Sequence, residues 1–323
     1  MGKETVLIIG SCGQVGTELT EALREQYGSS QVIASDIRKP DGDIWNAGPF
    51  ELMDVLDTQK IAEVMGKYKP TQIYHLAASL SASAEKNPKL GWRLNMDGLF
   101  YVFDAAIEYK VGRVFWPSSI AVFGPGTPKQ DTPQHCVMDP NTVYGITKQT
   151  GERYCDYYFK RYGLDVRSIR YPGLIGYKAE AGGGTTDYAV EIFHAALKHG
   201  HYECFLNESS QLPMLYMPDA IKATLDITHA PLEKIKIRSS YNLAGFSFSP
   251  AVLAEKIKMH IPAFEISYKP DSRQAIADSW PQSINDNEAR NDWGWKNDYD
   301  LDAMVKDMIE NLQPLYIAPE ASI

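Results

Sequence analysis

The 323-residue sequence predicts an α/β protein built on a doubly wound parallel sheet, with a smaller C-terminal lobe. Short β-branched runs alternate with longer helical patterns through the first half of the chain, which is typical of parallel βαβ units. The predicted strands are followed by small or polar residues, and ligands bind such sheets at the carboxyl ends of their strands. We therefore expect a site at one sheet edge, near Gly10, Asp36, Ala77, Ser119 and Tyr171.

Composition excludes several classes of partner. The formal net charge of −9 and a pI near 5.3 argue against a nucleic-acid-binding surface, which would be basic. No apolar run approaches the roughly 18 residues that a membrane span needs. The first apolar run, residues 6–9, is too short for a signal-peptide core, so we expect a cytoplasmic protein.

The cysteines (Cys12, Cys136, Cys155 and Cys204) are scattered, which indicates reduced thiols and no metal site.

The first βα unit carries a glycine-rich turn. A strand at residues 5–9 leads into Gly10, Gly13 and Gly16, and a helical pattern follows at 17–27. In this context glycines let the backbone approach a dinucleotide pyrophosphate, which rests on the helix N-terminus. The spacing is GxxGxxG rather than GxGxxG, and a tight strand–helix turn is the alternative interpretation. The context favours a Rossmann-type cofactor site.

The second strand, residues 31–35, ends in Asp36, twenty residues after Gly16. A carboxylate at this place can accept hydrogen bonds from the ribose hydroxyls of adenosine and would repel a 2′-phosphate. The sequence therefore favours NAD over NADP. Arg38 could in principle accommodate a phosphate, which leaves NADP open.

Between residues 50 and 170 the predicted strands and helices continue to alternate. His75 lies inside an apolar strand, and we expect it to be a core histidine with its hydrogen bonds satisfied. Asp54 is the acidic residue near the end of the third strand. The expected strands are residues 50–56, 72–78, 113–116 and 165–170, and the expected helices are 58–68, 88–109 and 142–162.

Tyr144 and Lys148 stand four residues apart, so on a helix they share one face. A tyrosine with a pKa of about 10 is a poor base near neutral pH, but an adjacent ammonium favours the phenolate and lowers that pKa. A hydroxyl such as that of Ser119 could hold a substrate oxygen against the pair. The alternative is an ordinary amphipathic helix with both residues on its exposed face.

After residue 175 the pattern changes. A glycine-rich loop at 180–187 enters a helix at 188–198, and strands or short helices are expected at 212–217, 241–243, 249–260 and 264–268 before a last helix at 301–312. We expect a Rossmann domain at 1–175 and a mainly substrate-binding lobe at 176–316 from which some segments return to the main sheet. A disordered tail is expected at 317–323.

The glycine turn, Asp36, Asn95, Ser119 and the Tyr144–Lys148 pair together resemble an extended short-chain dehydrogenase/reductase. Within that superfamily the chain is similar to the short-chain type of L-threonine 3-dehydrogenase, through segments at 79–83, 176–179, 184–192, 212–219, 280–284 and 290–295.

The resemblance implies roles for individual residues. Tyr144 would be the general base, Lys148 its electrostatic support and ribose ligand, Ser119 the hydroxyl anchor, and Asn95 the residue that holds the site's geometry. When the segment from Ser118 to Gly124 is aligned with the family, Ser119 and not Ser118 takes the position of the catalytic hydroxyl. The implied substrate residues are Ser81, Ser119, Tyr144, Gly184, Thr185, Thr186 and Trp280. The implied cofactor residues are Gly10, Gly13, Gln14, Val15, Gly16, Asp36, Ile37, Arg38, Asp54, Val55, Leu76, Ala77, Ala78, Asn95, Pro117, Ser118, Tyr144, Lys148 and Tyr171.

The implied reaction is oxidation of the L-threonine side-chain hydroxyl by NAD, without a metal, to 2-amino-3-oxobutanoate. A nucleotide-sugar epimerase or dehydratase of the same superfamily is the main alternative. Its second lobe would need arginines for a diphosphate, yet Arg238 is the one arginine between residues 182 and 241. A non-catalytic dinucleotide-binding sensor is a remote alternative. The resemblance also implies a homodimer that pairs through the helices around Asn95 and Tyr144.

Overall fold

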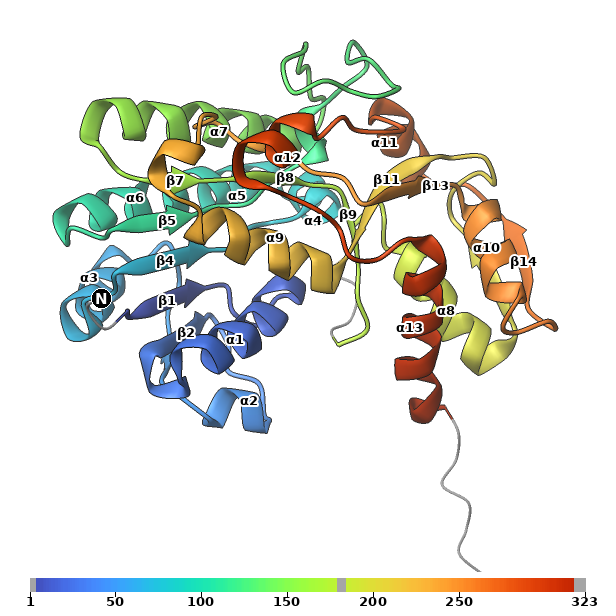
Figure 1. Ribbon diagram of the computed structural model, residues 1–323, viewed down its shortest axis with the longest axis horizontal. Coiled ribbons are helices and arrows are strands. Elements are labelled where there is room, and N and C mark those ends of the chain that lie inside the picture. Colours follow the sequence, from blue (N-terminus) through green and yellow to red (C-terminus); the bar gives the residue numbers. More distant parts are fainter. Residues whose placement is uncertain (1–3, 179–183, 317–323) are drawn as a thin grey trace, which may run out of the picture.

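A computed structural model describes residues 4–178 and 184–316 of the chain. Its central layer is a parallel sheet of six strands in the spatial order β3-β2-β1-β4-β5-β7, with helices on both faces (Figure 1). The predicted doubly wound α/β fold is confirmed. The strands are β1 (Val6–Ile9), β2 (Val32–Asp36), β3 (Phe50–Leu52), β4 (Gln72–His75), β5 (Arg113–Phe115) and β7 (Val166–Arg167).

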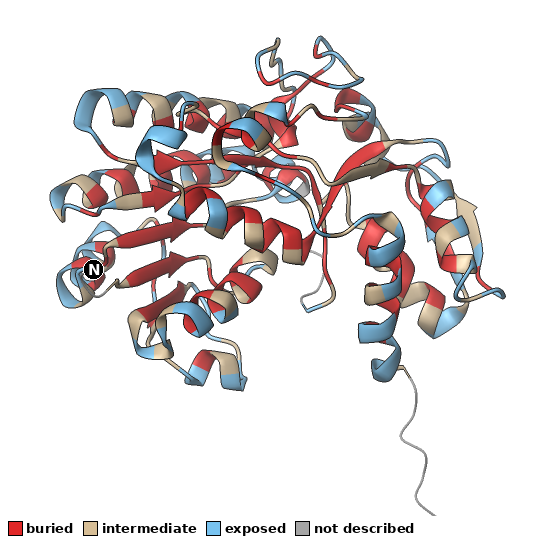
Figure 2. Ribbon diagram, viewed as in Figure 1, coloured by how far each residue is buried: buried red, intermediate tan, exposed pale blue. Residues whose placement is uncertain are grey.

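Successive side chains of the strands enter two different cores, because side chains alternate across a pleated strand. Leu7 and Ile9 of β1 pack into one core with α3 (Thr58–Tyr68), α6 (Gly98–Glu108) and α7 (Val143–Tyr162). Val6 and Ile8 pack into the other with α1 (Gln14–Tyr27) and α9 (Met217–His229). In Figure 2 the strands are buried and the helices are exposed on their outer sides. This two-sided burial explains why the strand sequences read as continuous apolar runs.

Helix α7 has well-defined ends. The Thr142 side chain accepts a hydrogen bond from the Gly145 amide and so caps the N-terminus, and Gly163 adopts a left-handed conformation (φ 73°) after the last turn. Between these ends the helix packs closely on the sheet. A Cβ atom at Gly151 would lie 2.3 Å from the indole of Trp116, so only glycine permits this approach.

Two predicted elements differ from the structure. The helix expected at 88–109 consists of α5 (Pro88–Trp92), a π-helical segment (Arg93–Asp97) and α6, and π turns of this kind occur at functional sites. The single strand expected at 165–170 is wrong. It is divided into β7, which pairs with β5, and β8 (Ile169–Tyr171), which joins β6 (Ser118–Ser119) and β12 (Tyr241–Asn242) in a separate sheet. Ser168 stands between the two strands, and its hydroxyl lies 2.9 Å from that of Ser240, just before β12.

Helix α9 was not predicted from the sequence. Pro218 lies in its first turn, where proline is favoured, so a helix-start signal was present. Arg167 donates to the carbonyls of Ile227, Thr228 and Ala230 and so binds the C-terminal end of the helix to β7. A segment from the second half of the chain thereby covers one face of the sheet.

The remaining elements form a second lobe, drawn at the right of Figure 1. Its sheet has the order β13-β11-β9, from β13 (Phe246–Phe248), β11 (Leu212–Tyr216) and β9 (Gly173–Ile175), and a parallel pair joins β10 (His201–Cys204) to β14 (Glu265–Tyr268). Its helices are α8 (Tyr188–His199), α10 (Pro250–Lys258), α11 (Arg273–Ser279) and α13 (Leu301–Leu312). Helix α12 (Asn287–Trp293) lies nearer the main sheet, and its Ala289 packs into the core that also holds α1 and α9. Two short helices lie elsewhere, α2 (Asp43–Asn46) and α4 (Ser81–Lys86).

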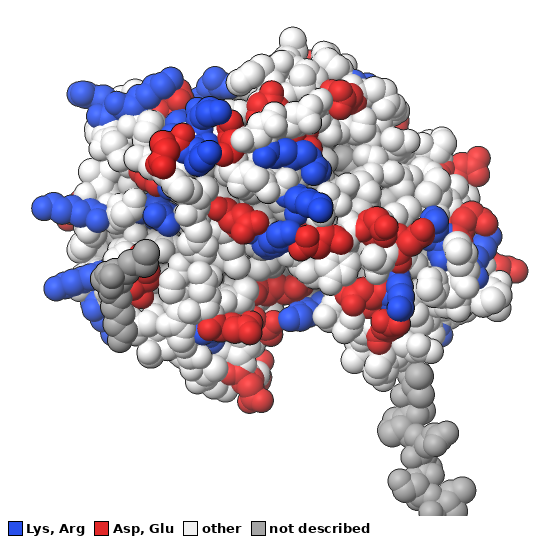
Figure 3. Space-filling model, viewed as in Figure 1, with Lys and Arg blue, Asp and Glu red and all other residues white. Residues whose placement is uncertain are grey.

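On the face drawn in Figure 3, basic and acidic side chains are interspersed and form no continuous basic stripe. Within the described ranges, no helix is long and apolar enough to cross a membrane.

The Gly151–Trp116 contact generates a stability prediction. Gly151→Ala should destabilise the fold by about 1–3 kcal/mol, because a methyl group at that position forces α7 away from the indole. Gly66→Ala is the matched control, since the nearest atom to its Cβ would be 3.9 Å away and alanine is the better helix former by roughly 1 kcal/mol. Urea denaturation should rank the proteins as G66A at least as stable as wild type, with G151A below both. A G151A protein as stable as wild type would contradict the packing argument.

Candidate active site

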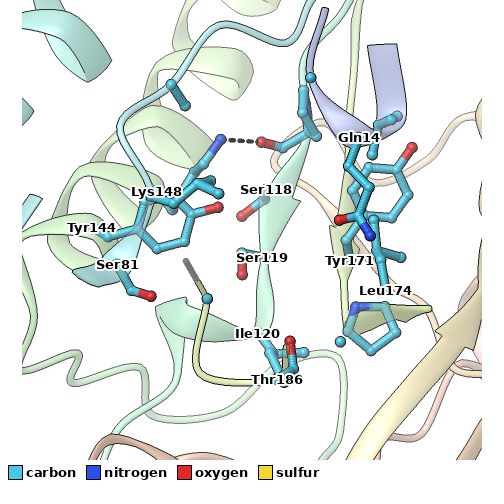
Figure 4. Close-up of a pocket in the computed structure, with 18 of the residues that line it drawn as sticks. Gln14, Ser81, Ser118, Ser119, Ile120, Tyr144, Lys148, Tyr171, Leu174 and Thr186 are labelled. Atoms are coloured by element: carbon cyan, nitrogen blue, oxygen red, sulfur yellow. Dashed lines mark hydrogen bonds between the residues drawn. The ribbon is translucent and has the colours of Figure 1, made fainter. Parts of the chain in front are cut away.

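A cavity of about 250 Å³ lies where the carboxyl ends of the strands meet the second lobe (Figure 4). It brings together residues that are far apart in sequence. Predicted residues that line it are Gly10, Gly13, Gln14, Val15, Gly16, Leu76, Ala78, Ser81, Pro117, Ser118, Ser119, Tyr144, Lys148, Tyr171, Gly184, Thr185, Thr186 and Trp280.

The glycine turn forms one wall of the cavity. Gly10 has a positive φ of 86°, and a Cβ there would meet the Ala77 amide at 2.6 Å. A Cβ at Gly16 would lie 2.4 Å from the Gly10 carbonyl oxygen, so both glycines are required for the turn to close. Gly13 is exposed, and a Cβ there would meet only the Gly10 carbonyl oxygen, at 3.6 Å. The first amides of α1 therefore face the cavity with room for a phosphate group.

Asp36 is fixed beside this turn. One carboxylate oxygen accepts a hydrogen bond from the Cys12 amide at 2.9 Å, and the other accepts from the Ile37 amide at 2.8 Å. The Gly10 and Ser11 amides donate to the Ser35 carbonyl, which holds the turn against the end of β2. The Asp36 carboxylate therefore lies next to the amides of the glycine turn.

Tyr144 and Lys148 lie on the cavity side of α7. The Lys148 ammonium is buried, donates to the Pro117 carbonyl oxygen at 2.6 Å and lies 4.4 Å from the centre of the Trp116 ring. It lies 5.6 Å from the centre of the Tyr144 ring. In Figure 4 the phenol hydroxyl of Tyr144 points toward the two serines. The exposed-face alternative for this pair is excluded by the burial of Lys148.

The electrostatics of the pair differ from the sequence expectation. Burial raises the pKa of Tyr144 to about 12, and a hydrogen bond with Ser119 opposes that shift. Burial also lowers the pKa of Lys148 to about 7, although Cys155 and Glu152 act in the opposite direction. The expected lowering of the tyrosine pKa by the ammonium is therefore absent here, because desolvation disfavours the charged form of both groups.

The two serines are distinguished by their partners. The Ser118 hydroxyl is buried and donates to Glu152 at 2.6 Å. The Ser119 hydroxyl accepts from the Ala121 amide at 3.2 Å and interacts with Tyr144. Ser119 is consequently the serine whose hydroxyl remains directed at the tyrosine.

Asn95 lies behind the cavity, on the π-helical segment. Its side-chain oxygen accepts from the Ser79 amide at 2.7 Å, and its amide group donates to the Ser79 carbonyl at 3.1 Å and to Thr147 at 3.0 Å. Thr147 in turn donates to the Tyr144 carbonyl. Asn95 thus joins the loop after β4 to the helix that carries Tyr144, and it does not line the cavity.

The second lobe supplies the opposite wall. Thr185 is fully buried, and its hydroxyl has no hydrogen-bond partner among residues 4–178 and 184–316. Thr186 packs against Gly173, where a Cβ would meet its side chain at 2.8 Å. Lys129 donates to the carbonyls of Ser279 and Trp280, which holds the indole at the cavity. Gly182 and Gly183 of the predicted loop lie outside the described residues.

Several predicted residues do not line the cavity. Asp54 is exposed and accepts a hydrogen bond from the Leu56 amide, and Val55 packs in the core against Gly98. The other predicted residues that do not line it are Asp36, Ile37, Arg38, Ala77 and Asn95. Lining residues that sequence reasoning missed are Leu80, Ile120, Pro172, Gly173, Leu174 and Asp187. Proximity in sequence to a predicted strand end or motif could have indicated all six.

His75 differs from the satisfied core histidine expected from the sequence. It is buried, but neither ring nitrogen has a hydrogen-bond partner in the described part of the chain. Burial, assisted by the charge of Lys148, lowers the pKa of His75 to about 3. The ring is therefore uncharged.

The described ranges contain no group of three or more His, Cys, Asp or Glu side chains that could hold a metal ion. All four cysteines are unpaired thiols.

Comparison with known proteins identifies the family. Residues 6–244 match the model of the NAD dependent epimerase/dehydratase family. A mitochondrial L-threonine 3-dehydrogenase of Sus scrofa is 46% identical over 305 residues, which cover 94% of this chain and 81% of that protein. The chain therefore belongs to this family, and the resemblance to extended short-chain dehydrogenase/reductases is confirmed.

Solved structures agree with this assignment. The holo form of a GalE-like L-threonine dehydrogenase from Cupriavidus necator superposes with a TM-score of 0.93 at 52% identity, covering 95% of this chain and 99% of that one. The apo form of a monomeric L-threonine 3-dehydrogenase from a metagenome superposes with a TM-score of 0.94 at 48% identity, covering 97% and 100%.

Proposed function

We propose that this member of the NAD dependent epimerase/dehydratase family oxidises the side-chain hydroxyl of L-threonine with NAD, giving 2-amino-3-oxobutanoate, NADH and a proton. The observation that carries the proposal is the cavity in which Ser119, Tyr144 and Lys148 lie between a phosphate-binding turn and a small polar wall. The threonine dehydrogenases reported above share this fold and about half of the sequence.

The cavity fits a dinucleotide on one side and a small substrate on the other. The amides of the glycine turn and Asp36 would hold the pyrophosphate and the adenosine ribose, and Lys148 would hold the second ribose. NAD bound there accepts a hydride from the carbon that carries the threonine hydroxyl. Among the described residues that line the cavity, Lys148 is the one cationic side chain. This favours a small substrate over a nucleotide sugar, whose diphosphate needs cationic partners.

Arg238, the one arginine between residues 182 and 241, does not line the cavity. It donates to Asp165 at 2.8 Å and to the Leu232 carbonyl, and its guanidinium lies 3.8 Å from the centre of the Phe159 ring. None of these partners lines the cavity either. The epimerase alternative therefore has no arginine from this segment at the cavity.

Chemistry at the cavity rests on three side chains. Tyr144, as its phenolate, removes the proton of the threonine hydroxyl, and Ser119 donates a hydrogen bond that orients the substrate oxygen. The Lys148 ammonium favours the phenolate electrostatically. Because burial disfavours both charged forms, ionisation of Tyr144 is the main electrostatic demand of the reaction. Proton removal by a positioned base contributes roughly 10²–10⁴ in rate.

The opposite wall suits an amino acid. We assign Ser81, Thr185 and Thr186 to the amino and carboxylate groups, because a hydroxyl can donate to a carboxylate and accept from an ammonium group. Gly184 lines the same wall, and its amide donates to the Asp187 side chain at 2.6 Å. The unpaired hydroxyl of Thr185 supports this assignment, since a buried polar group without a partner costs free energy until a ligand satisfies it. Trp280, Ile120 and Leu174 would enclose the methyl group.

We further propose a Rossmann domain at 1–175, a mainly substrate-binding lobe at 176–316, and a cytoplasmic location. The catalytic helix belongs to the first part and the Thr185 wall to the second. Substrate therefore binds between the two.

The function is tested by NADH absorbance with NAD and L-threonine. Wild type should form NADH, and Tyr144→Phe should lose roughly 10²–10⁴ in kcat with little change in NAD affinity, because the base is lost but the ring remains. Tyr162→Phe, an exposed tyrosine on the same helix, is the control and should behave as wild type. The proposal fails if wild type oxidises no β-hydroxy amino acid, or if calorimetry shows tight binding of UDP-sugars and none of threonine.

Asp36 provides a cofactor test. Asp36→Ala should raise the KM for NAD at least about tenfold, equivalent to about 1.4 kcal/mol, and should narrow the preference for NAD over NADP. Asp41→Ala removes an exposed acid nearby and should change neither. An unchanged NAD/NADP ratio in D36A would show that Asp36 does not contact the ribose.

We also propose a homodimer that pairs through α5, α6 and α7. Exposed apolar side chains lie on α5 (Leu90 and Trp92) and on α7 (Ile146, Tyr157 and Tyr162), and exposed apolar groups of this kind can mark an interface. A related enzyme is described as monomeric, so the state needs measurement. Sedimentation equilibrium should give a dimer, and the double variant Ile146→Glu/Tyr157→Glu should give a monomer. A monomeric wild type would refute the proposal.

A further inference from the structure

A buried ion pair lies directly beneath the catalytic residues. Glu152 of α7 is 0% exposed and Arg170 of β8 is 2% exposed. Two hydrogen bonds of 2.8 Å join them, from the guanidinium Nε to one carboxylate oxygen and from Nη2 to the other. A pair this deeply buried contributes little net stability compared with an apolar pair of the same shape, so its presence needs another reason.

The pair connects the two elements that carry the catalytic groups. Glu152 lies one turn after Lys148 on α7, and the same carboxylate accepts the Ser118 hydroxyl at 2.6 Å. Ser118 and Ser119 pair with Arg170 and Tyr171 in the β6–β8 register. One carboxylate therefore fixes the serine strand against the helix of Tyr144 and Lys148.

The connection continues into the second lobe. Arg170 also donates to the Asn242 side chain at 2.9 Å, and Asn242 donates to the Asn285 carbonyl at 3.0 Å. Asn285 lies five residues beyond Trp280, which lines the cavity. An unbroken series of hydrogen bonds thus runs from the serine strand to the segment that forms the opposite wall.

The Glu152 carboxylate also acts on the Lys148 ammonium electrostatically. Its negative charge raises the pKa of Lys148 against the effect of burial. The other groups that face Lys148 are uncharged near neutral pH: burial keeps the pKa of Cys155 well above its usual range, that of Tyr144 at about 12 and that of His75 at about 3. Among residues 4–178 and 184–316, Glu152 is therefore the carboxylate whose charge favours the protonated form of Lys148.

We propose that Glu152, paired with Arg170, is a positioning residue of the dehydrogenase reaction that fixes Ser118 and Ser119 against α7 and places its carboxylate one helical turn from Lys148. The inference rests on the proposed function. It assigns to Glu152 two effects that are separable by experiment. The first is geometric, through Ser118, and the second is electrostatic, through Lys148.

The electrostatic effect is tested by the pH profile of kcat/KM for threonine at saturating NAD. Lys148 supports the phenolate only when protonated, so activity is lost as pH rises through the lysine pKa. Glu152→Gln keeps the shape of the side chain and removes its charge, which lowers that pKa. The alkaline limb should therefore move to lower pH by about one unit. Glu310→Gln, an exposed glutamate of α13, should leave the profile unchanged.

A double variant separates the effect of losing the Glu152 charge from the effect of leaving the Arg170 guanidinium without its partner. In E152Q the Arg170 guanidinium is unpaired, and its positive charge alone would also disfavour protonated Lys148. Glu152→Gln/Arg170→Met removes both charges. The alkaline limb should remain below that of wild type; a limb restored to the wild-type pH would overturn the electrostatic role of Glu152.

The geometric effect is tested by Ser118→Ala. Loss of the hydrogen bond should lower kcat by roughly 10-fold through misplacement of Ser119, without moving the alkaline limb, because no charge changes. Since Ser118 lies at the cavity, the KM for NAD is measured in the same assay. An unchanged kcat would refute the positioning role. Because this substitution is small, it also tests the positioning role of Glu152 if the Glu152 variants do not fold.

The outcomes distinguish failure of the inference from failure of the proposed function. If wild type forms no NADH with threonine, the function is wrong. If wild type is active and E152Q has the wild-type kcat/KM and pH profile, the positioning inference alone is wrong.

Discussion

The active site depends on the close approach of α7 to the serine strand and to Trp116. Two glycines on the helix make this possible: a Cβ at Gly145 would lie 2.2 Å from the Ala121 carbonyl oxygen, and one at Gly151 would lie 2.3 Å from Trp116. No other side chain fits at these contacts. Because the helix is this close, the Lys148 ammonium reaches the Pro117 carbonyl and lies against the indole.

Burial created by this packing then sets the electrostatics. Desolvation disfavours the phenolate of Tyr144, the ammonium of Lys148 and the imidazolium of His75 alike, and it does so more strongly than any neighbouring charge opposes it. Glu152 and Arg170, which are also buried, form an ion pair with each other at 2.8 Å. The site is thus a low-dielectric pocket in which small changes of charge have large effects.

The second lobe contributes one wall of the cavity through hydrogen bonds between residues about 150 positions apart in the chain. The Lys129 ammonium, in the loop after β6, donates hydrogen bonds to the carbonyl oxygens of Ser279 and Trp280. The Lys129 carbonyl in turn accepts from the Gln282 amide at 2.7 Å. These bonds attach a late segment of the chain to the catalytic half. The cavity therefore forms only when both halves are folded.

The sequence alone determined the parallel α/β fold, the glycine turn, Asp36 as its neighbour, and the Tyr144–Lys148 face of one helix. These follow from local rules: apolar runs mark buried strands, glycines mark a tight turn, and residues four apart share a helix face. A local rule also supplied the helix-start signal at Pro218 that the sequence analysis overlooked.

Only the tertiary structure decided the remainder, because each point depends on contacts between distant residues. The segment expected to be one strand at 165–170 pairs in two different sheets, and the Ser118 hydroxyl donates to Glu152. The ring nitrogens of His75 have no hydrogen-bond partner among the described residues. The tertiary structure also reversed the expected shift of the Tyr144 pKa, since burial is set by packing and not by spacing. Periodicity in sequence identifies faces and turns, whereas desolvation and pairing exist only once the chain has folded.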